Sequence, residues 1–500
     1  MSEISWSRSR RWLLPAIMLV YLILGTLYAV HTPAWQAPDE PAHYNYIQYL
    51  AEQRRFPILK LGDYPAEYLE EIKAAHFPPE MSIAPIRYEY HQPPLYYLLA
   101  VPVYRLSGTL FPGNLLLPLR LFSVALGALL LLVVHWVVQA LAPGRPGLAL
   151  GAAAFVAFLP MHLAMTAATN NDTLAELLLA TLLLLSLRYL KLGDSPEDQR
   201  EGTRLLVLMG VTTGLSFVTK SSIYVALPLV LLAIALKQFW LDGSSVGRGL
   251  KAGMIYLLPA IALGLPWWLR NIALYGDLDF LGLGRHDQVV VGQLRTAEFV
   301  TQHGAGPLIG DFFLTSFRSF WGQFGWMGVL VDQRIYQAMA ILSALAVIGF
   351  AIWAARIWRN CQAFPRWQWA AGSLLAVLGL LALASYVWYN LQFVQHQGRY
   401  LFIALIPISL VAALGWREVL RRERGWPLAA ALLGGAVVLK LAGLLPNWPL
   451  LMLIVAAAAL AVRRFLPPKL DPFVQASPYV LLIFFDLSSL YLYIVPQLAL

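Results

Sequence analysis

Charged residues are scarce in this chain and make up 13% of its 500 residues, whereas soluble domains carry about 25%. Hydrophobic residues account for 59%, and stretches such as 13–30 contain no charged side chain. A helix needs roughly 20 apolar residues to cross the hydrocarbon layer of a membrane. A chain so poor in charge cannot cover a water-facing globule. We therefore predict an all-α polytopic membrane protein.

The chain also lacks sequence features that are typical of disulfide-linked, repeat, zinc-binding and nucleic-acid-binding proteins. Its one cysteine, Cys361, excludes an internal disulfide. No internal repeat is visible, and no His-Glu-x-x-His zinc motif occurs. The formal charge of +9 comes from short basic clusters between apolar runs, a pattern typical of the cytoplasmic loops of membrane proteins. We predict no nucleic-acid partner.

Apolar runs separated by charged residues predict about 13 membrane-spanning helices. The N-terminal stretch has Arg8, Arg10 and Arg11 before an apolar run that is too long for a signal-peptide core, so we expect a retained first helix. Alternating the helices places nearly every basic cluster on one side, which is then the cytoplasm of a cell-membrane protein with a cytoplasmic N-terminus. The predicted spans lie near 13–31, 117–141, 147–167, 173–190, 204–220, 223–240, 252–268, 335–353, 370–390, 401–416, 427–445, 449–462 and 477–495.

Two long loops break the pattern of short connections, and both fall on the predicted external side. Within the first, 31–116, the segment 94–106 is apolar and rich in tyrosine but too short to span, which is typical of a helix lying at the membrane interface. We expect a transmembrane module over 1–270 that carries this loop. A second external loop, 271–334, and C-terminal transmembrane helices, 335–500, would follow.

Two adjacent carboxylates, Asp39 and Glu40, stand in the first loop between Pro38 and Pro41. Proline favours the first position of a helix, and acidic residues at that point commonly cap the helix and interact well with its dipole. Capping is the simplest explanation of an isolated acidic pair. Other polar residues predicted at the same membrane face favour a functional site instead.

Ionisable residues gather at the predicted external ends of several helices. Charges near hydrocarbon are costly and usually have a partner or a function. Singly, each has a simple explanation: Arg270 and Arg399 would reach lipid headgroups, and Asp172 would cap its helix. Together they predict one site on the extracytoplasmic face. Its candidates beside the acidic pair are His43, Arg87, Glu89, His91, Asp172, Lys220, Arg270 and Arg399.

With these residues assembled, the sequence resembles the GT-C glycosyltransferases that use polyprenyl-phosphate sugars. This superfamily includes the protein O-mannosyltransferases and the aminoarabinose transferase of lipid A. The resemblance is strongest over roughly the first 270 residues. It rests on Asp39-Glu40, Pro-Pro-Leu-Tyr-Tyr at 93–97, Asn-Asp at 171–172, Thr-Lys at 219–220, Pro-Trp-Trp-Leu-Arg-Asn at 266–271 and Gln-Gly-Arg-Tyr at 397–400.

The resemblance implies a GT-C-like bundle that moves a sugar from a polyprenyl-phosphate donor to a lipid, glycan or protein acceptor, with inversion at the sugar carbon. It assigns the general base to Asp39, supported by Glu40, and contact with the donor phosphate to Lys220. We expect Glu40, Glu89 and His91 to shape the acceptor site.

One departure from the resemblance concerns the donor phosphate. Many relatives have Glu-Lys before the paired prolines, where this chain has His91-Gln92. A phosphate-binding lysine is therefore absent from that point. The residues expected to replace it are Arg87, Arg270 or Arg399.

The chemistry leaves two further questions open. Transfer from a lipid phosphate needs a base for the acceptor hydroxyl and cations for the leaving phosphate, whereas a glycosidase needs two carboxylates on either side of the sugar. Asp39, Glu40 and Asp172 would suit a divalent cation such as Mg²⁺ or Mn²⁺ if their oxygens formed a cage. The rival class is a transporter or flippase, which usually shows repeated halves and sites near the middle of the bilayer.

Overall fold

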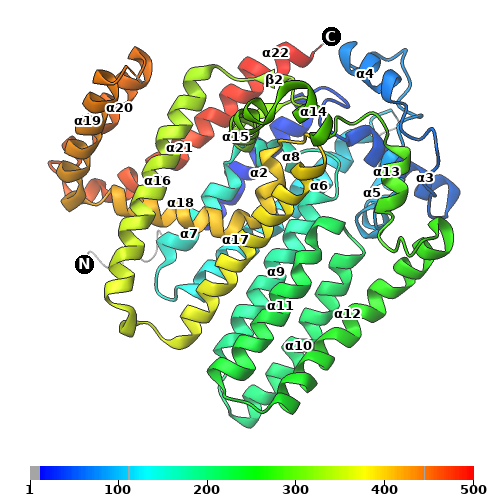
Figure 1. Ribbon diagram of the computed structural model, residues 1–500, viewed down its shortest axis with the longest axis horizontal. Coiled ribbons are helices and arrows are strands. Elements are labelled where there is room, and N and C mark those ends of the chain that lie inside the picture. Colours follow the sequence, from blue (N-terminus) through cyan, green and yellow to red (C-terminus); the bar gives the residue numbers. More distant parts are fainter. Residues whose placement is uncertain (1–11, 111–112, 444, 500) are drawn as a thin grey trace.

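The computed structural model describes residues 12–110, 113–443 and 445–499 (Figure 1). Regular structure within them is almost entirely helical. The strands described are β1 (Gln323–Phe324) and β2 (Val329–Leu330), which pair antiparallel. The predicted basic N-terminal cluster of Arg8, Arg10 and Arg11 lies outside the described residues. The prediction of an all-α polytopic membrane protein is confirmed.

Ten helical segments in the described part of the chain are long and apolar enough to cross a membrane. Five are single helices before or around the middle of the chain: α2 (Leu13–His31), α6 (Leu116–Leu141), α9 (Asp172–Lys191), α12 (Val246–Tyr275) and α16 (Gln333–Arg359). Another is α17 (Arg366–Gln392), which follows the turn η4 (Cys361–Ala363).

The other four join several helical pieces. They are Ser221–Leu241 with η2 (Ser221–Val225), α11 (Ala226–Ala235) and η3 (Leu236–Leu241); Gly398–Val419 with η5 (Gly398–Ala404) and α18 (Leu405–Val419); Arg422–Leu441 with η6 (Arg422–Arg424) and α19 (Gly425–Leu441); and Pro468–Leu498 with η7 (Pro468–Leu470), α21 (Asp471–Ser488), η8 (Ser489–Ile494) and α22 (Val495–Leu498).

The predicted count of 13 spans is not confirmed. The predicted span 147–167 is a bent pair, α7 (Pro146–Ala157) and α8 (Pro160–Thr166), and counting it as one span gives up to 11 within the described residues. Pro160 begins α8 after a bend of 67°, since proline is disfavoured in a helix interior and is tolerated in the first turn. The other two predictions correspond to α10 (Pro196–Phe217), which has five charged residues between 197 and 204, and α20 (Asn447–Arg463), which has only 17 residues.

A layer of short helices lies at one end of the bundle. The first predicted loop forms α3 (Glu40–Gln53), α4 (Ala66–Ala74), η1 (Tyr88–His91) and α5 (Leu95–Leu110). The second forms α13 (Leu283–Val289), α14 (Thr296–His303), α15 (Ala305–Trp321) and the β hairpin. Figure 1 shows α3, α5 and α13 together near the end of α12, with α4 farther out at the top.

Tyrosines hold this layer together. The rings of Tyr46 on α3 and Tyr97 on α5 stack with their centroids 3.7 Å apart, and Tyr90 and Tyr96 pack edge-on against that pair. All four side chains are buried. Aromatic contacts of this kind bury large areas with specific geometry, so α5 is fixed against α3 and not free on the membrane surface.

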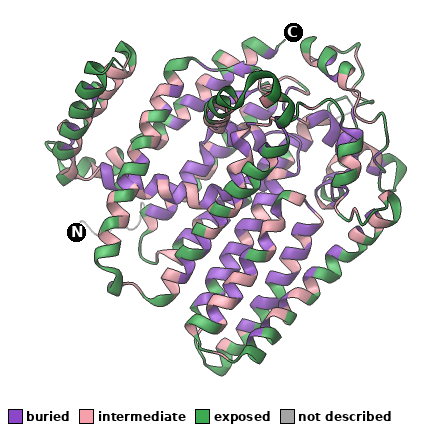
Figure 2. Cartoon of the chain, in the orientation of Figure 1, coloured by how far each residue is buried: buried purple, intermediate pink, exposed green. Residues whose placement is uncertain are grey.

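The bundle core is formed by α2, α6, α7, α9, α11, α17 and α18, whose facing surfaces are buried (Figure 2). By contrast, α19 and α20 pack mainly on each other at the edge of the molecule (Figure 1). The buried part of their contact with the rest of the chain is a small cluster of Val419, Ala429, Ala457 and Leu460. Most of the apolar surface of these two helices is left for lipid.

Candidate active site

Asp39 lies at a sharp turn between α2 and α3. Its backbone is left-handed, with φ of 67°, a conformation that asparagine and aspartate tolerate better than most other residues. Pro41 occupies the first turn of α3, as the sequence predicts. Asp39 stands at the N-cap position, yet its side chain makes no capping hydrogen bond. Its carboxylate is therefore held for some other contact.

The carboxylate of Asp39 binds two side chains that come from distant parts of the sequence. The hydroxyl of Tyr88 donates to Oδ1 at 2.8 Å, and the guanidinium of Arg399 donates to Oδ2 at 2.9 Å. The Arg399 side chain is 8% exposed and that of Asp39 is 30% exposed. One side of this ion pair is therefore open.

The charges around Asp39 favour its ionised form. Burial raises the pKa of this carboxyl, but Arg399, His43 and the hydrogen bond from Tyr88 outweigh burial, and the pKa falls below its usual 3.8. Burial and the nearby charge of Asp39 raise the pKa of Tyr88 well above its usual value. Asp39 is thus a carboxylate and Tyr88 a neutral donor at neutral pH.

Glu40 is in a different environment from its neighbour. It is fully buried and forms a two-point ion pair with Arg120 on α6, at 2.8 and 2.6 Å. The backbone N–H groups of Trp35 and Thr169 also donate to its carboxylate. Arg120 in turn donates to three carbonyls near the end of α2: Ala29, Thr32 and Pro33. Glu40 and Arg120 therefore clamp the turn that presents Asp39.

A second ion pair lies at the same end of the bundle. Lys220, just before η2, donates to Asp172 at the start of α9 at 2.5 Å, and their side chains are 20% and 34% exposed. Neighbouring Asn171 is fully buried and donates to the carbonyl of Thr219, which ties the two helix ends together. Arg399 interacts electrostatically with Asp172 as well as with Asp39. The two ion pairs thus belong to one polar site.

His43 and Glu89 lie beside these pairs. Nδ1 of buried His43 is 2.8 Å from the hydroxyl of Tyr97. Burial lowers the pKa of His43, and the negative charges of Glu89 and Asp39 offset only part of that effect. Glu89 is 9% exposed, and its Oε2 has no hydrogen-bond partner in the part of the chain that the structure describes. A buried carboxylate oxygen without a donor is costly, so this oxygen is suited to a ligand group.

Three of the sequence-predicted residues contact groups other than the two ion pairs. Arg87 is exposed and donates to the carbonyl of Ala84. Arg270 stacks on Trp267 and donates to the carbonyl of Pro57. His91 is buried against His286 of α13, with ring centroids 4.5 Å apart, and burial and His286 lower the pKa of His91 well below its usual value.

Three residues of the site were not among the sequence-predicted candidates. Arg120 had a signal, because a lone arginine inside the predicted span 117–141 needs a partner. Tyr88 and Tyr97 belong to the aromatic segment before and within α5, but the sequence does not specify which tyrosines face Asp39 and His43. Both are buried and both donate or accept a hydrogen bond there.

The proposed oxygen cage for a metal ion is not formed. Asp39, Glu40 and Asp172 each bind a separate cation: Arg399, Arg120 and Lys220 respectively. Among the described residues no group of three or more His, Cys, Asp or Glu side chains is arranged to hold a metal ion. These carboxylates, as placed, do not fit a shared Mg²⁺ or Mn²⁺.

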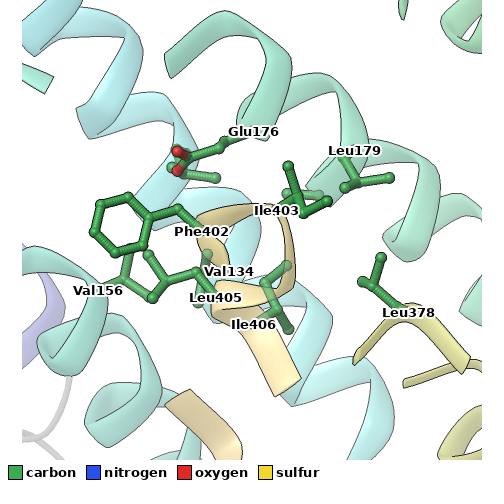
Figure 3. A pocket seen from close by; sticks show the side chains of 11 residues that line it. Val134, Val156, Glu176, Leu179, Leu378, Phe402, Ile403, Leu405 and Ile406 are labelled. Carbon is green, nitrogen blue, oxygen red and sulfur yellow. The ribbon is translucent and has the colours of Figure 1, made fainter. Parts of the chain in front are cut away.

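A small cavity lies deeper in the bundle, one turn along α9 from Asp172. Its volume is about 20 Å³, close to the minimum that one water needs. Figure 3 shows Glu176 as the one polar side chain at its edge, with Val134, Phe402, Ile406 and other apolar residues around it. Glu176 binds His162 of α8 at 2.8 Å. This cavity is too small for a sugar, so the candidate site is the polar group nearer the helix ends.

Comparison with known protein families identifies the family of this chain. Residues 84–412 match the family described as predicted membrane protein (DUF2142). The chain belongs to this family. Among curated protein sequences none matches the chain.

Solved structures show the same fold at low sequence identity. The apo oligosaccharyltransferase of Archaeoglobus fulgidus matches with a TM-score of 0.52 and 14% identity, over 96% of this chain and 56% of that protein. Its complex with an inhibitory peptide and a dolichol-phosphate matches with 0.51 and 13%, over 94% and 56%. Apo ArnT from Cupriavidus metallidurans matches with 0.50 and 15%, over 98% and 77%.

These likenesses confirm the GT-C fold that the sequence resemblance implies. The DUF2142 chain spans about half the length of the archaeal oligosaccharyltransferases. The fold places the turn after the first helix, the start of α9 and η5 at one end of the bundle. That is where the two ion pairs meet.

Proposed function

We propose that this DUF2142 protein is a membrane glycosyltransferase that moves a sugar from a polyprenyl-phosphate donor to an acceptor hydroxyl. One observation carries the proposal: two carboxylate–cation pairs, Asp39–Arg399 and Asp172–Lys220, lie in one polar site at the end of a GT-C bundle. Both pairs are partly exposed, so a substrate has access to both a base and a cation.

In the proposed reaction the acceptor oxygen attacks the anomeric carbon of the sugar from the face opposite the phosphate. The new carbon–oxygen bond forms while the bond to the phosphate oxygen breaks, which inverts the anomeric centre. Asp39 takes the proton of the acceptor hydroxyl, a role for which its ionised form is required. The leaving group is the polyprenyl phosphate, whose added negative charge needs stabilisation by cations.

Arg399 and Lys220 are the proposed contacts of that phosphate. Each already binds a carboxylate, so an arriving phosphate competes for the same cation. When Arg399 turns toward the phosphate, Asp39 loses the partner that lowers its pKa most strongly among its neighbours. Donor binding would then raise the basicity of Asp39 at the moment when the acceptor is deprotonated. Arg87 and Arg270, held by other contacts, are not part of this proposal.

The acceptor is proposed to lie on the side of His43 and Glu89, because the unpartnered Oε2 of Glu89 suits a hydroxyl donor. The dolichol-phosphate in the archaeal complex makes a polyprenyl phosphate a reasonable donor carrier here. The acceptor class remains a lipid, a glycan or a protein. No step of the mechanism uses a metal ion, since the three carboxylates do not fit a shared one.

The donor assignment is tested with purified protein and a polyprenyl phosphate that carries a radiolabelled sugar. Lys220→Ala should weaken donor binding and slow release of the sugar, because a charge-assisted contact acts both in the ground state and in the transition state. Lys191→Ala, at the opposite end of α9, is the matched control and should bind the donor normally. Normal binding and transfer by Lys220→Ala would remove Lys220 from the site.

We also propose that the site faces the extracytoplasmic side of the cell membrane and the N-terminus the cytoplasm, as the positive-inside rule favours. Cys361 lies exposed after α16, and Glu67 lies exposed on α4. In intact cells an impermeant thiol reagent should label Glu67→Cys in a Cys361→Ser background. It should label Cys361 of the wild-type chain only after permeabilisation. The reverse pattern would place the site in the cytoplasm.

A further inference from the structure

A second polar cavity lies at the other end of the bundle from Asp39. Arg399 and Glu418 stand near opposite ends of the membrane-length segment Gly398–Val419, and Glu418 lines the cavity. Its volume is about 440 Å³. It lies between the start of α7, the last turns of α16 and the end of α18. Its polar side chains include Arg145, Arg356, Arg417, Glu418 and Arg421.

Glycines bring α16 and α18 close enough to form this cavity. A Cβ at Gly415 would lie 1.9 Å from the carbonyl oxygen of Ala346, and one at Gly349 would lie 2.1 Å from the carbonyl oxygen of Gly415. No side chain fits at those distances, so the two helices cross in backbone contact. The crossing lies about one turn before Trp353 on α16 and Glu418 on α18. It fixes the cavity walls on both sides.

Arginines outnumber carboxylates among the described residues that line this cavity. Glu418 is 2% exposed and binds Arg356 at 3.0 Å, with Arg421 and Arg424 at 3.5 Å. Among the described residues that line the cavity, four are arginines and one is a glutamate. Glu423, outside the lining, lies 3.8 Å from Arg421. A group of arginines around one carboxylate attracts a further anion.

The rest of the lining suits a molecule with an apolar part. Trp353 lines the cavity, and its Nε1 is buried without an acceptor among the described residues. Leu148, Ile357 and Phe364 line the cavity too. The cavity therefore offers both charged and apolar walls to one molecule.

We propose that this cavity binds the phosphate headgroup of an anionic phospholipid. The arginines and the Trp353 N–H would hold phosphate and ester oxygens, while the apolar lining of Leu148, Ile357 and Phe364 would contact the start of the acyl chains. Basic pockets between transmembrane helices on the cytoplasmic side bind anionic headgroups in other membrane proteins. The site is separate from the Asp39 site and does not depend on the proposed transferase activity.

The test uses the full chain in nanodiscs with equal amounts of phosphatidylglycerol and phosphatidylcholine, released for native mass spectrometry. The wild-type protein should retain phosphatidylglycerol preferentially. Arg145→Gln and Arg417→Gln should each lower that retention on the order of fivefold, and the double variant more. Arg359→Gln, an exposed arginine on the last turn of α16 outside the cavity lining, is the control and should match the wild type.

A second variant reverses the sign of the effect. Glu418→Gln removes the one carboxylate of the lining and frees its arginines, so retention of phosphatidylglycerol should rise. If the arginines served only to satisfy Glu418, that variant would lose stability without any gain in lipid. Equal retention by the wild type and the double variant overturns the proposal. Displacement of the lipid by millimolar free glycerol phosphate overturns it too, because the cavity would then bind a soluble phosphate.

Discussion

Asp39 and Glu40 are neighbours in the sequence, and each binds an arginine, yet the two ion pairs differ. The pair of Glu40 with Arg120 is closed to solvent, and backbone N–H groups supply further donors to the carboxylate. The pair of Asp39 with Arg399 is open on one side, and its arginine is shared electrostatically with Asp172. The closed pair, Glu40–Arg120, has no hydrogen-bonding capacity left for a substrate. The open pair, Asp39–Arg399, can exchange partners.

This contrast indicates a structural role for Glu40 and a chemical role for Asp39. Burying an ion pair contributes little net stability when its desolvation is included, but removing one partner of such a pair is strongly destabilising. The Glu40–Arg120 pair therefore fixes the turn, and the turn sets the left-handed backbone of Asp39. We infer that variants of the closed pair lose folding before function, and that variants of the open pair lose function before folding.

The largest expected effect is on the closed pair. Arg120→Leu leaves the Glu40 carboxylate buried without its cation and should lower the free energy of unfolding by about 3–5 kcal/mol. Thermal unfolding of the purified protein in detergent measures this loss. Arg204→Leu is the control, because the Arg204–Glu201 pair is exposed and such pairs contribute about 0–1 kcal/mol. A stable Arg120→Leu protein would contradict the role of the clamp.

The next effect concerns the cation of the open pair. Arg399→Gln should weaken binding of a polyprenyl-phosphate sugar on the order of 10-fold to 100-fold, since a hydrogen bond to a charged group contributes about 1.5–3 kcal/mol. Without Arg399 the pKa of Asp39 should rise, so the acid limb of the pH–activity profile should move to higher pH. Arg270→Gln is the control and should leave donor binding and the acid limb unchanged.

A smaller effect on stability is expected when the pH is lowered and His43, beside the open pair, becomes protonated. Burial lowers the pKa of His43 below its usual 6.5, so the unfolded chain binds more protons than the folded one just below pH 6.5. Stability contributed by neutral His43 is then complete above pH 6.5 and declines as the pH falls toward its lowered pKa. His43→Gln should reduce the loss of melting temperature between pH 7.5 and 5.5. The exposed His303→Gln should show the same loss as the wild type.

The smallest effect is expected at the hydrogen bond to Oδ1 of Asp39. Tyr88→Phe removes one donor from a partly exposed carboxylate, so stability should fall by only about 0.5–1.5 kcal/mol. Because the Tyr88 hydrogen bond lowers the pKa of Asp39, that pKa should rise slightly in the variant. Chemical unfolding and the pH–activity profile measure the two changes. A loss of stability as large as that of Arg120→Leu would show that the open pair is also part of the clamp.

The sequence predicts the helical bundle because long uncharged runs have few other solutions. The predicted 13 spans exceed the ten or eleven long apolar helices of the described residues, because α10 has charged first turns and α20 is short. The sequence also predicts that Asp39, Asp172, Lys220 and Arg399 lie at one membrane face. All four stand at helix ends that fall on the same side when successive helices cross in alternate directions. Their pairing agrees with that placement.

The rest of the site depends on side-chain direction and on contacts between distant segments. Arg270 turns toward Trp267 and Pro57, and His91 faces His286 in the second loop. Hydropathy and alternation contain no information on either contact. Arg120 is the exception, because a charge within an apolar helix signals a partner even when the partner is unknown. The partner of Arg120, Glu40, becomes evident only when α2, α3 and α6 are packed together.

The most direct test of the account compares Asp39→Asn with Glu40→Gln in one set of preparations, measuring unfolding, donor binding and sugar transfer. Asp39→Asn should fold and should bind the polyprenyl-phosphate sugar at least as tightly as the wild type, because no carboxylate then competes for Arg399. Transfer should fall by about 10²–10⁴-fold, the usual contribution of a general base. Glu40→Gln should lose stability first. Normal transfer by a folded Asp39→Asn protein would contradict the assignment of Asp39 as the base.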